Sequence, residues 1–375
     1  MANLRNPFII GKYVSSDYFC DRRQETDTLY HHLSNGRNVA LMSERRLGKT
    51  GLIEHTFATR MDAEYYTFMI DIYTCKNLRE MVCMLANEVF KVFARRQSIT
   101  DRLLQFIHSL SASVSYNAIT GEPEIGLKLG EIKQPEATLD DLLSYLEMAD
   151  KPCIVGIDEF QRITEFDEKN MEELLRTKIQ HLRNTQIVFA GSERHLLEGI
   201  FNDPERPFYN SVVFMQLQPI DKQEYVKFSQ RLFAEHGKNV EGELVEHLYE
   251  YFKGVTWYLQ LSMNEAFTLA NRGETLTDDA FQAILTHMVD TKRYTFEDRY
   301  ASLTEKQKAV LMAIATEYPD IPTPTSQNFI TKHSLKTASS VQTAMKGLTD
   351  KKILQEQHGR RIVTDILFIL WLKNY

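Results

Sequence analysis

Residues 39–50 decide the fold, and they read Val39-Ala40-Leu41-Met42-Ser43-Glu44-Arg45-Arg46-Leu47-Gly48-Lys49-Thr50. The apolar start of this stretch predicts a buried strand, and the polar residues after it predict a turn. Leu52, Ile53 and Phe57 then fall at helical spacing, which predicts a helix directly after the turn. The N-terminus of such a helix carries free backbone N–H groups, and these favour an anion.

The turn ends in Gly-Lys-Thr, which is the end of the phosphate-binding pattern G-x-x-x-x-G-K-[ST]. In that pattern the lysine reaches the β- and γ-phosphates and the hydroxyl binds Mg²⁺, so Lys49 and Thr50 are assigned these roles. The alternative is an ordinary strand, turn and helix with an exposed lysine. Ser43 stands where the pattern has its first glycine, and we expect the loop to enter its turn differently because serine adopts positive φ at a cost. The predicted nucleotide contacts of the loop are Ser43, Glu44, Arg45, Arg46, Leu47, Gly48, Lys49, Thr50 and Gly51.

A second apolar segment, residues 153–157, ends in the carboxylates Asp158 and Glu159. Side chains at the carboxyl edge of an open α/β sheet face the ligand crevice. We expect Asp158 to reach Mg²⁺ through water, and Glu159 to act as the base or to orient the attacking water. A strand that merely ends in solvated acids is the alternative. The phosphate loop upstream argues against it, because a phosphate cradle and a metal carboxylate are complementary halves of one site.

Two further side chains are candidates for the same site. Ser192 follows a third apolar segment, residues 186–191, and Ser192 or Glu193 is predicted to sense the γ-phosphate from a neighbouring strand; a plain strand end is the equal alternative. Arg22 lies shortly before the loop and is a candidate for the nucleobase side, or else an ordinary surface charge.

Strands alternate with helical segments through the first half of the chain, which predicts a parallel sheet with right-handed crossovers. The fold class is therefore α/β, with a P-loop core over residues 1–218 and a β-hairpin insertion at about 112–130. Residues 222 to about 290 read as helical throughout, and we assign a small helical domain to 219–295, which the family resemblance described below implies to be a helical lid domain. Residues 300–375 predict three helices and a two-stranded wing, a winged helix-turn-helix. The apolar run 366–372 is expected to pack back onto this domain.

The composition is that of a soluble globular protein, with 375 residues, 43% hydrophobic content and a net charge of -7. The four cysteines form no C-x-x-C pair, which argues against a disulfide framework or a zinc site. No apolar run approaches the roughly 18 residues of a membrane span, so we expect a cytoplasmic protein without a membrane partner. From residue 303 on, ten basic and six acidic side chains leave +4, against -11 for the remainder.

The sequence resembles the prokaryotic and archaeal-type ATPase family, within the STAND and AAA+ branch of P-loop NTPases, over nearly its full length. The resemblance rests on Phe19-x-x-Arg22-x-x-Glu25, Arg45-Arg46-Leu47-Gly48-Lys49-Thr50, Ile157-Asp158-Glu159-Phe160-Gln161, Ala190-Gly191-Ser192, Ser339-Ser340-Val341 and Asp365-x-x-Phe368-x-x-Trp371-Leu372. It implies ATP binding and Mg²⁺-dependent hydrolysis by a five-stranded core, a helical lid and a winged helix.

Three positions depart from the family pattern. Besides Ser43, residues 207–211 lack the arginine of the family's Pro-Leu-Tyr-Gly-Arg, and Arg206 is close but not equivalent. An arginine finger is worth about 10³–10⁵ in rate, so we expect slow turnover. Gly254-Val255-Thr256 also lacks the proline of the family's Gly-x-Pro.

Three functions compete on this basis. The first is a slow Mg²⁺-dependent ATPase that acts as a nucleotide switch and repositions the winged helix, with Glu159, Lys49 and Ser192 as catalytic residues. The second is a DNA-binding or transcription regulatory protein, and the third is a nucleotide-binding scaffold that does not hydrolyse. The candidate partners are ATP, DNA, an unidentified protein and further copies of the chain.

Overall fold

The structure is a computed structural model, and it describes residues 5–95, 113–116, 123–126, 132–357 and 360–374. The chain forms two compact units, Met1–Asn264 and Glu265–Tyr375. The first unit contains a five-stranded sheet, and the second contains the helices and the hairpin of the C-terminal region. The predicted domain boundaries at 218/219 and between 295 and 300 stay predictions.

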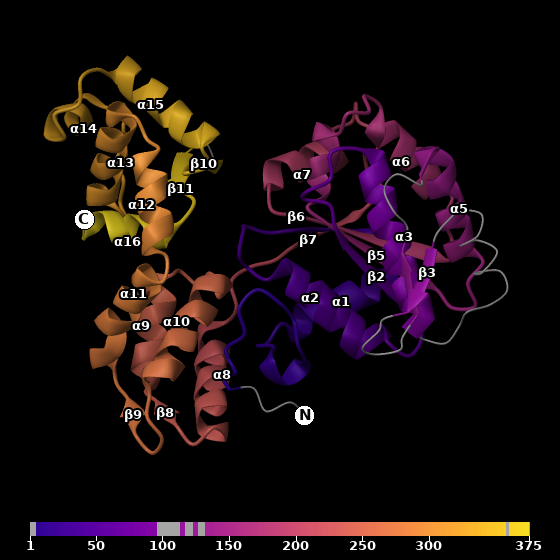
Figure 1. The fold of residues 1–375 in the computed structure, drawn as a ribbon, viewed down its shortest axis with the longest axis horizontal. Helices are drawn as coiled ribbons and strands as arrows, with labels where there is room; N and C mark the ends of the chain where they lie inside the picture. Colours follow the sequence, from indigo (N-terminus) through magenta and orange to yellow (C-terminus); the bar gives the residue numbers. More distant parts are fainter. Residues whose placement is uncertain (1–4, 96–112, 117–122, 127–131, 358–359, 375) are drawn as a thin grey trace. The chain divides into compact units, whose positions relative to one another are not determined.

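A parallel sheet forms the centre of the first unit (Figure 1). Its strand order is β2-β5-β6-β1-β7, and every neighbouring pair runs parallel, as the sequence predicted. The loop strand β1 is therefore separated from the carboxylate strand β5 by β6 alone. The strands are β1 (Val39–Met42), β2 (Tyr66–Asp71), β5 (Cys153–Asp158), β6 (Thr185–Gly191) and β7 (Val213–Gln216).

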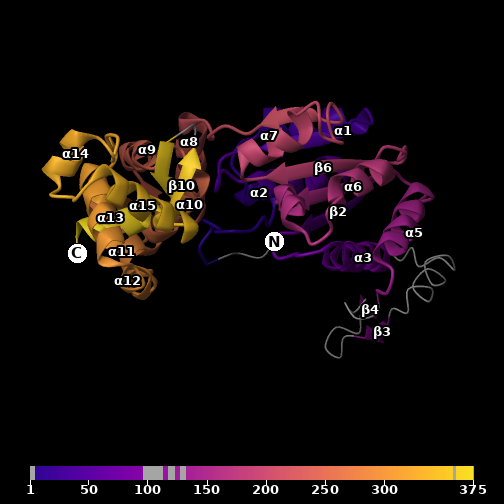
Figure 2. The same ribbon diagram turned by 90° about the horizontal axis from the view of Figure 1, so that it is seen from above.

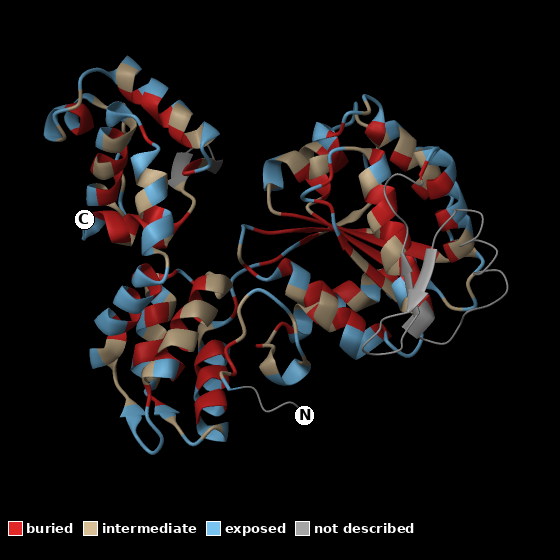
Figure 3. Cartoon of the chain, viewed as in Figure 1, coloured by how far each residue is buried: buried red, intermediate tan, exposed pale blue. Residues whose placement is uncertain are grey.

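Helices cover both faces of this sheet, and its central strands are buried along their whole length (Figure 3). Side chains alternate between the faces: Val39 and Leu41 pack with the helices α1 and α2, whereas Ala40 and Met42 join the core under α3, α5, α6 and α7. Burial on both faces explains the continuous apolar runs of these strands. The helices are α1 (Arg23–Ser34), α2 (Lys49–Thr56), α3 (Leu78–Arg95), α5 (Pro135–Glu147), α6 (Met171–Ile179) and α7 (Arg194–Asn202).

A cluster of four phenylalanines packs at the carboxyl end of β5 and β6. Phe160, Phe189, Phe201 and Phe208 are at most 1% exposed, and all their ring centroids lie between 4.4 and 5.8 Å from one another. Phe160 directly follows Glu159, so the cluster anchors the end of the strand that carries the carboxylates. Aromatic pairs at such distances stabilise a core beyond the area that they bury.

The region from 222 to 290 is not helical throughout, which corrects the sequence prediction. It contains α8 (Lys222–Glu235), α9 (Gly242–Tyr251) and α10 (Thr256–Leu269), but also the short strands β8 (Asn239–Val240) and β9 (Thr275–Leu276). Gly237 and Gly273, with φ of 70° and 78°, precede these strands. A glycine in the left-handed conformation commonly ends a helix, and these two glycines interrupt the helical pattern. The helix α10 begins in the first unit and ends in the second.

The predicted insertion at 112–130 lies mostly outside the described residues. Within it, β3 (Ser113–Tyr116) pairs antiparallel with β4 (Pro123–Gly126). The residues that connect these strands, and those that follow β4 up to 131, lie outside the described residues.

The second unit contains the winged helix (Figure 1 and Figure 2). The helices α13 and α15 pack together, and α15 contacts the first strand of an antiparallel hairpin whose tip, residues 358–359, is outside the described residues. One helix, α12, was not predicted. The elements are α11 (Phe281–Asp290), α12 (Arg293–Ala301), α13 (Glu305–Glu317), α14 (Gln327–Lys332), α15 (Ala338–Asp350), β10 (Leu354–Gln357), β11 (Arg360–Val363) and α16 (Ile366–Lys373).

The apolar C-terminal run forms the helix α16 and packs back onto this unit, as expected. The rings of Phe368 and Trp371 lie 5.2 and 6.2 Å from that of Phe296 in α12. Although α16 is strongly apolar, it has only eight residues. None of the described helices combines the length and the apolar character that a membrane crossing requires.

We predict that Phe208→Ala lowers the free energy of unfolding by about 3–5 kcal/mol, because it leaves a cavity in the phenylalanine cluster. The neighbouring Tyr209 provides a matched control, since it is 42% exposed whereas Phe208 is 1% exposed. Tyr209→Ala should change the same quantity by less than about 1 kcal/mol. Urea unfolding followed by circular dichroism measures both, and equal losses in the two variants would contradict the assignment of the cluster as core.

Candidate functional site

The loop between β1 and α2 carries two residues in the left-handed region, Arg46 and Gly48, with φ of 71° and 90°. Gly48 is the residue before the first turn of α2, which begins at Lys49. Ser43 is not among the residues with positive φ, so it adopts no conformation that would require glycine. Arg46 is therefore the non-glycine residue of the loop with a left-handed backbone. Ser43, which replaces the pattern's first glycine, does not have one.

Lys49 is a buried cation at the start of α2. Its side chain is 6% exposed, and Nζ donates a hydrogen bond to Ser43 Oγ at 3.3 Å. Burial lowers the pKa of Lys49, while the neighbouring carboxylates Asp158 and Glu159 act in the opposite direction. An ammonium group in a poorly hydrated position beside a helix N-terminus is suited to an anionic ligand.

Thr50 and Asp158 bring the two predicted halves of the site into contact. The Thr50 hydroxyl donates a hydrogen bond to Oδ2 of Asp158, the last residue of β5. The other oxygen of Asp158 accepts the Glu159 N–H at 2.9 Å. A hydroxyl and a carboxylate are hard oxygen ligands of the kind that Mg²⁺ binds, with water and phosphate oxygens completing its shell. No cluster of three or more His, Cys, Asp or Glu side chains within the described ranges could hold a metal by itself.

The carboxylate of Glu159 accepts hydrogen bonds from Ser192, which follows the neighbouring strand β6, and from Gln161, two residues along the chain. Its Oε2 accepts hydrogen bonds from Ser192 Oγ at 2.9 Å and from Gln161 Nε2 at 2.5 Å. Ser192 also accepts a hydrogen bond from Arg45 Nε at 3.4 Å, and Arg45 pairs with Glu193 at 3.5 Å. A carboxylate held by two donors is oriented, and orientation is what a water-positioning group requires. Ser192 therefore contacts Glu159 directly.

Gln161 is a residue of this site to which sequence reasoning assigned no role. Its side chain is 1% exposed, and its Oε1 is a buried atom without a hydrogen-bond partner. Gly191 makes room for it, since a Cβ at that position would lie 2.3 Å from Gln161 Oε1. The signal in the sequence was an amide two residues after the carboxylate pair.

Arg22 contacts the backbone of the phosphate loop. It is 3% exposed, pairs with Glu25 at 2.7 Å, and donates from Nη2 to the Leu47 carbonyl at 3.3 Å. A buried guanidinium with a carboxylate and a carbonyl partner is a fixed structural element of the site. The surface-charge alternative for Arg22 is therefore wrong, because the side chain is buried.

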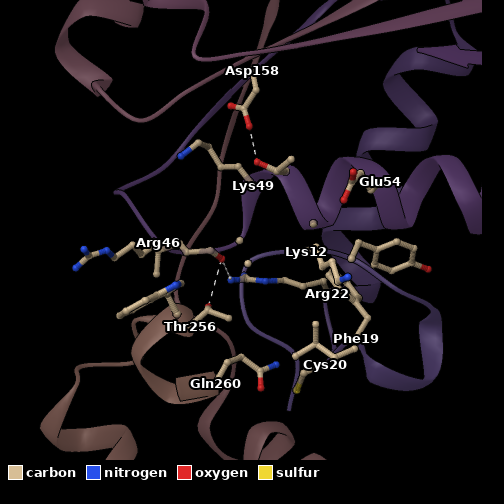
Figure 4. Close-up of a pocket in the computed structure, with 18 of the residues that line it drawn as sticks. Lys12, Phe19, Cys20, Arg22, Arg46, Lys49, Glu54, Asp158, Thr256 and Gln260 are labelled. Atoms are coloured by element: carbon tan, nitrogen blue, oxygen red, sulfur yellow. Dashed lines mark hydrogen bonds between the residues drawn. The ribbon is translucent and has the colours of Figure 1, made fainter. Parts of the chain in front are cut away.

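One pocket of about 460 Å³ is lined by loop residues 45–51 together with Arg22, Asp158, Glu159 and Ser192, and Gln161 is not part of its lining (Figure 4). Of the residues predicted for the site, Ser43, Glu44 and Glu193 do not line it, whereas all the others do. The side chain of Leu47 packs in the apolar cluster beneath the loop, so its backbone is the part available to a ligand. The sequence analysis assigned no site role to three other parts of the wall. These are Ile9, Gly11, Lys12, Tyr13 and Val14 near the N-terminus, Glu54 in α2, and Thr256, Trp257 and Gln260 in α10.

Arg206 forms an ion pair away from the pocket. It forms a two-pronged ion pair with Glu172 of α6, in which Nε lies 3.0 Å from Oε2 and Nη2 bonds to Oε1. Arg206 does not line the pocket. That Arg206 is not equivalent to the family's arginine stays a prediction.

Comparisons with solved structures show the fold. The Walker-type ATPase PABY2304 of Pyrococcus abyssi superposes with a TM-score of 0.62 at 19% identity, covering 98% of this chain and 99% of that one. The ORC2 protein of Aeropyrum pernix, in ADPNP–ADP complexes, gives 0.61 at 14% identity over 99% and 97%. The ORC1 protein of Aeropyrum pernix in complex with DNA gives 0.52 at 13% identity over 98% and 96%.

No curated protein sequence shows significant similarity to the chain. Residues 294–374 match the family described as a probable winged helix domain, which confirms the predicted C-terminal fold. Residues 19–261 match the family described as an ATPase domain predominantly from Archaea. That match covers more than half of the chain and includes the phosphate loop, the carboxylate strand and the start of α10. The chain therefore belongs to this family of ATPase domains found predominantly in Archaea.

Proposed function

We propose that the protein binds ATP with Mg²⁺ and hydrolyses it slowly, and that the bound nucleotide controls the disposition of the winged helix. One observation carries the proposal. The phosphate-loop residues Lys49 and Thr50 and the carboxylates Asp158 and Glu159 come together in a single pocket of about 460 Å³. Such a volume is that of an ordinary small-molecule site.

Each residue has a defined part in this proposal. The loop N–H groups and Lys49 bind the phosphates, and Thr50 and Asp158 hold Mg²⁺, which supplies charge neutralisation when bound. Glu159, oriented by Ser192 and Gln161, accepts a hydrogen bond from the attacking water and positions it. We expect slow turnover because residues 207–211 lack the family's arginine, and the nearby Arg206 pairs with Glu172 and does not line the pocket.

We predict that Lys49→Ala weakens ATP affinity by roughly 10- to 100-fold, because charge-assisted hydrogen bonds to the phosphates are lost. The matched control is Lys91→Ala, since Lys91 is an exposed lysine of α3 paired with Glu88 and does not line the pocket. Isothermal titration calorimetry with ATP and Mg²⁺ measures both. Near-normal affinity in the Lys49 variant would exclude the loop as the phosphate site.

We predict that Glu159→Gln keeps ATP affinity but lowers turnover by about 10²–10⁴-fold, because the amide cannot accept the proton of water. The measurements are phosphate release with Mg²⁺ and the amount of nucleotide that stays bound. If the wild type hydrolyses ATP no faster than the variant while both bind it, the protein is a nucleotide-binding scaffold or requires an arginine from a partner or a second copy.

A second candidate function is DNA binding by the winged helix. The helix α15 exposes Ser339, Gln342, Thr343 and Lys346 along its length, and these side chains are suited to phosphates and base edges. The region from 303 on carries a net charge of +4. A structural neighbour, the ORC1 protein of Aeropyrum pernix, is described in complex with DNA, which supports the proposal for this fold without establishing it for this chain.

We predict that alanine at Lys346, Arg360 and Arg361 together abolishes most duplex binding at low salt. If all three contact phosphates, the slope of log affinity against log salt should fall by about 2 to 3, because each lost contact removes about 0.9. Alanine at Lys306, Lys308 and Lys332 removes the same charge from α13 and α14 and serves as control. Fluorescence anisotropy with a labelled duplex at several salt concentrations measures the slopes, and no binding by the wild type at low salt would end this candidate.

A further inference from the structure

The side chain of Arg46 lies against the start of α10. Its guanidinium carbon is 4.8 Å from the ring centroid of Trp257 and 5.0 Å from that of Tyr258, and Nη1 donates a hydrogen bond to the Tyr258 hydroxyl. All three residues belong to the first unit. An arginine over two aromatic faces is held by attraction between the cation and the rings. The guanidinium therefore anchors the phosphate loop to α10.

The backbone of the loop is bound to the same helix. The Trp257 N–H donates to the Arg46 carbonyl at 3.0 Å, and the Thr256 hydroxyl donates to the Leu47 carbonyl at 3.3 Å. Arg22 donates to that second carbonyl as well, also at 3.3 Å (Figure 4). In a planar trans peptide the carbonyl and the following N–H point in opposite directions. These bonds therefore turn the next two N–H groups of the loop away from α10 and Arg22.

Arg46 needs this support because its backbone is left-handed, with φ of 71°. A residue with a side chain adopts this region at a cost and keeps it only where the surroundings impose it. Thr256 donates its hydrogen bond to the loop from a position where the family commonly has proline, and a proline side chain has no hydrogen-bond donor. The conformation of the phosphate-binding turn thus depends on contacts made by the first residues of α10.

We propose that Arg46 is a positioning residue that couples nucleotide binding in the loop to α10, through Trp257 and Tyr258. This inference rests on the proposed function, because it takes a nucleotide as the ligand of the loop. The helix α10 starts at Thr256 in the first unit and ends in the second, so it is the continuous element that a change in the loop would reach first. Coupling of this kind is reciprocal, and whatever biases α10 changes nucleotide affinity by the same factor.

The test is a double-mutant cycle on ATP affinity, with Arg46→Ala, Trp257→Leu and the double variant titrated with ATP and Mg²⁺. Each single change should weaken binding by roughly 5- to 10-fold, which is the effect of losing one such cation–aromatic contact. The double variant should bind no more weakly than the weaker single variant, because both remove one interaction. The control is Lys151→Ala, which removes a cation 5.8 Å from the Tyr66 ring at the opposite end of β5 and should leave affinity unchanged.

A spectroscopic readout separates positioning from general destabilisation. The chain has two tryptophans, so Trp371→Phe leaves Trp257 as the single reporter. Adding ATP with Mg²⁺ should change its emission, and Arg46→Ala should remove most of that change even at saturating nucleotide. Arg46→Lys keeps the charge and should restore part of both the affinity and the emission change.

Two negative results are distinguishable. If the wild type binds ATP while Arg46→Ala binds equally well, or the effects of the two single changes add, the coupling is wrong and the proposed function stands. If the wild type binds neither ATP nor ADP, the proposed function fails, and this inference fails with it.

Discussion

The site depends on one constraint of the sheet, which is that a single strand, β6, separates β1 from β5. Because all three strands run parallel, their carboxyl ends lie at the same edge. The loop after β1 therefore meets Asp158 and Glu159 after β5, and Ser192 after β6 lies between them. The hydrogen bond from Thr50 to Asp158 is the direct sign of this meeting. The proposed nucleotide chemistry follows from that shared edge.

Several charges are buried there, and each has partners that offset its loss of hydration. Lys49 contacts Ser43 and faces two carboxylates, and Arg22 binds Glu25 and a loop carbonyl. Burying an unpaired charge would cost several kcal/mol, so these pairings stabilise the fold around the candidate site. The lowered pKa of Lys49 shows that burial outweighs its neighbours.

The sequence allowed the fold class, the family, the parallel sheet and the winged helix to be predicted, and all four are confirmed. These predictions rested on continuous apolar runs and on the Gly-Lys-Thr turn. Hydrophobic periodicity and turn residues can be recognised from neighbouring positions in the sequence. The short strands β8 and β9 and the helix α12 were missed, since weak local patterns are overridden by packing. The roles assigned to individual site residues stay predictions, although the structure places most of them in one pocket.

By itself, the sequence determined which residues are candidates for the site: the cation and hydroxyl of the loop, the two carboxylates and the serine after β6. Only the tertiary structure decided how they are held. Gln161 orients Glu159, Gly191 leaves space for that amide, and Arg46 lies on α10. Gln161 is only two positions from Glu159, but Gly191 and Gln161 belong to different elements, and Arg46 and Trp257 lie more than two hundred positions apart. The local sequence pattern does not indicate such distant pairs, because chain topology and packing bring them together.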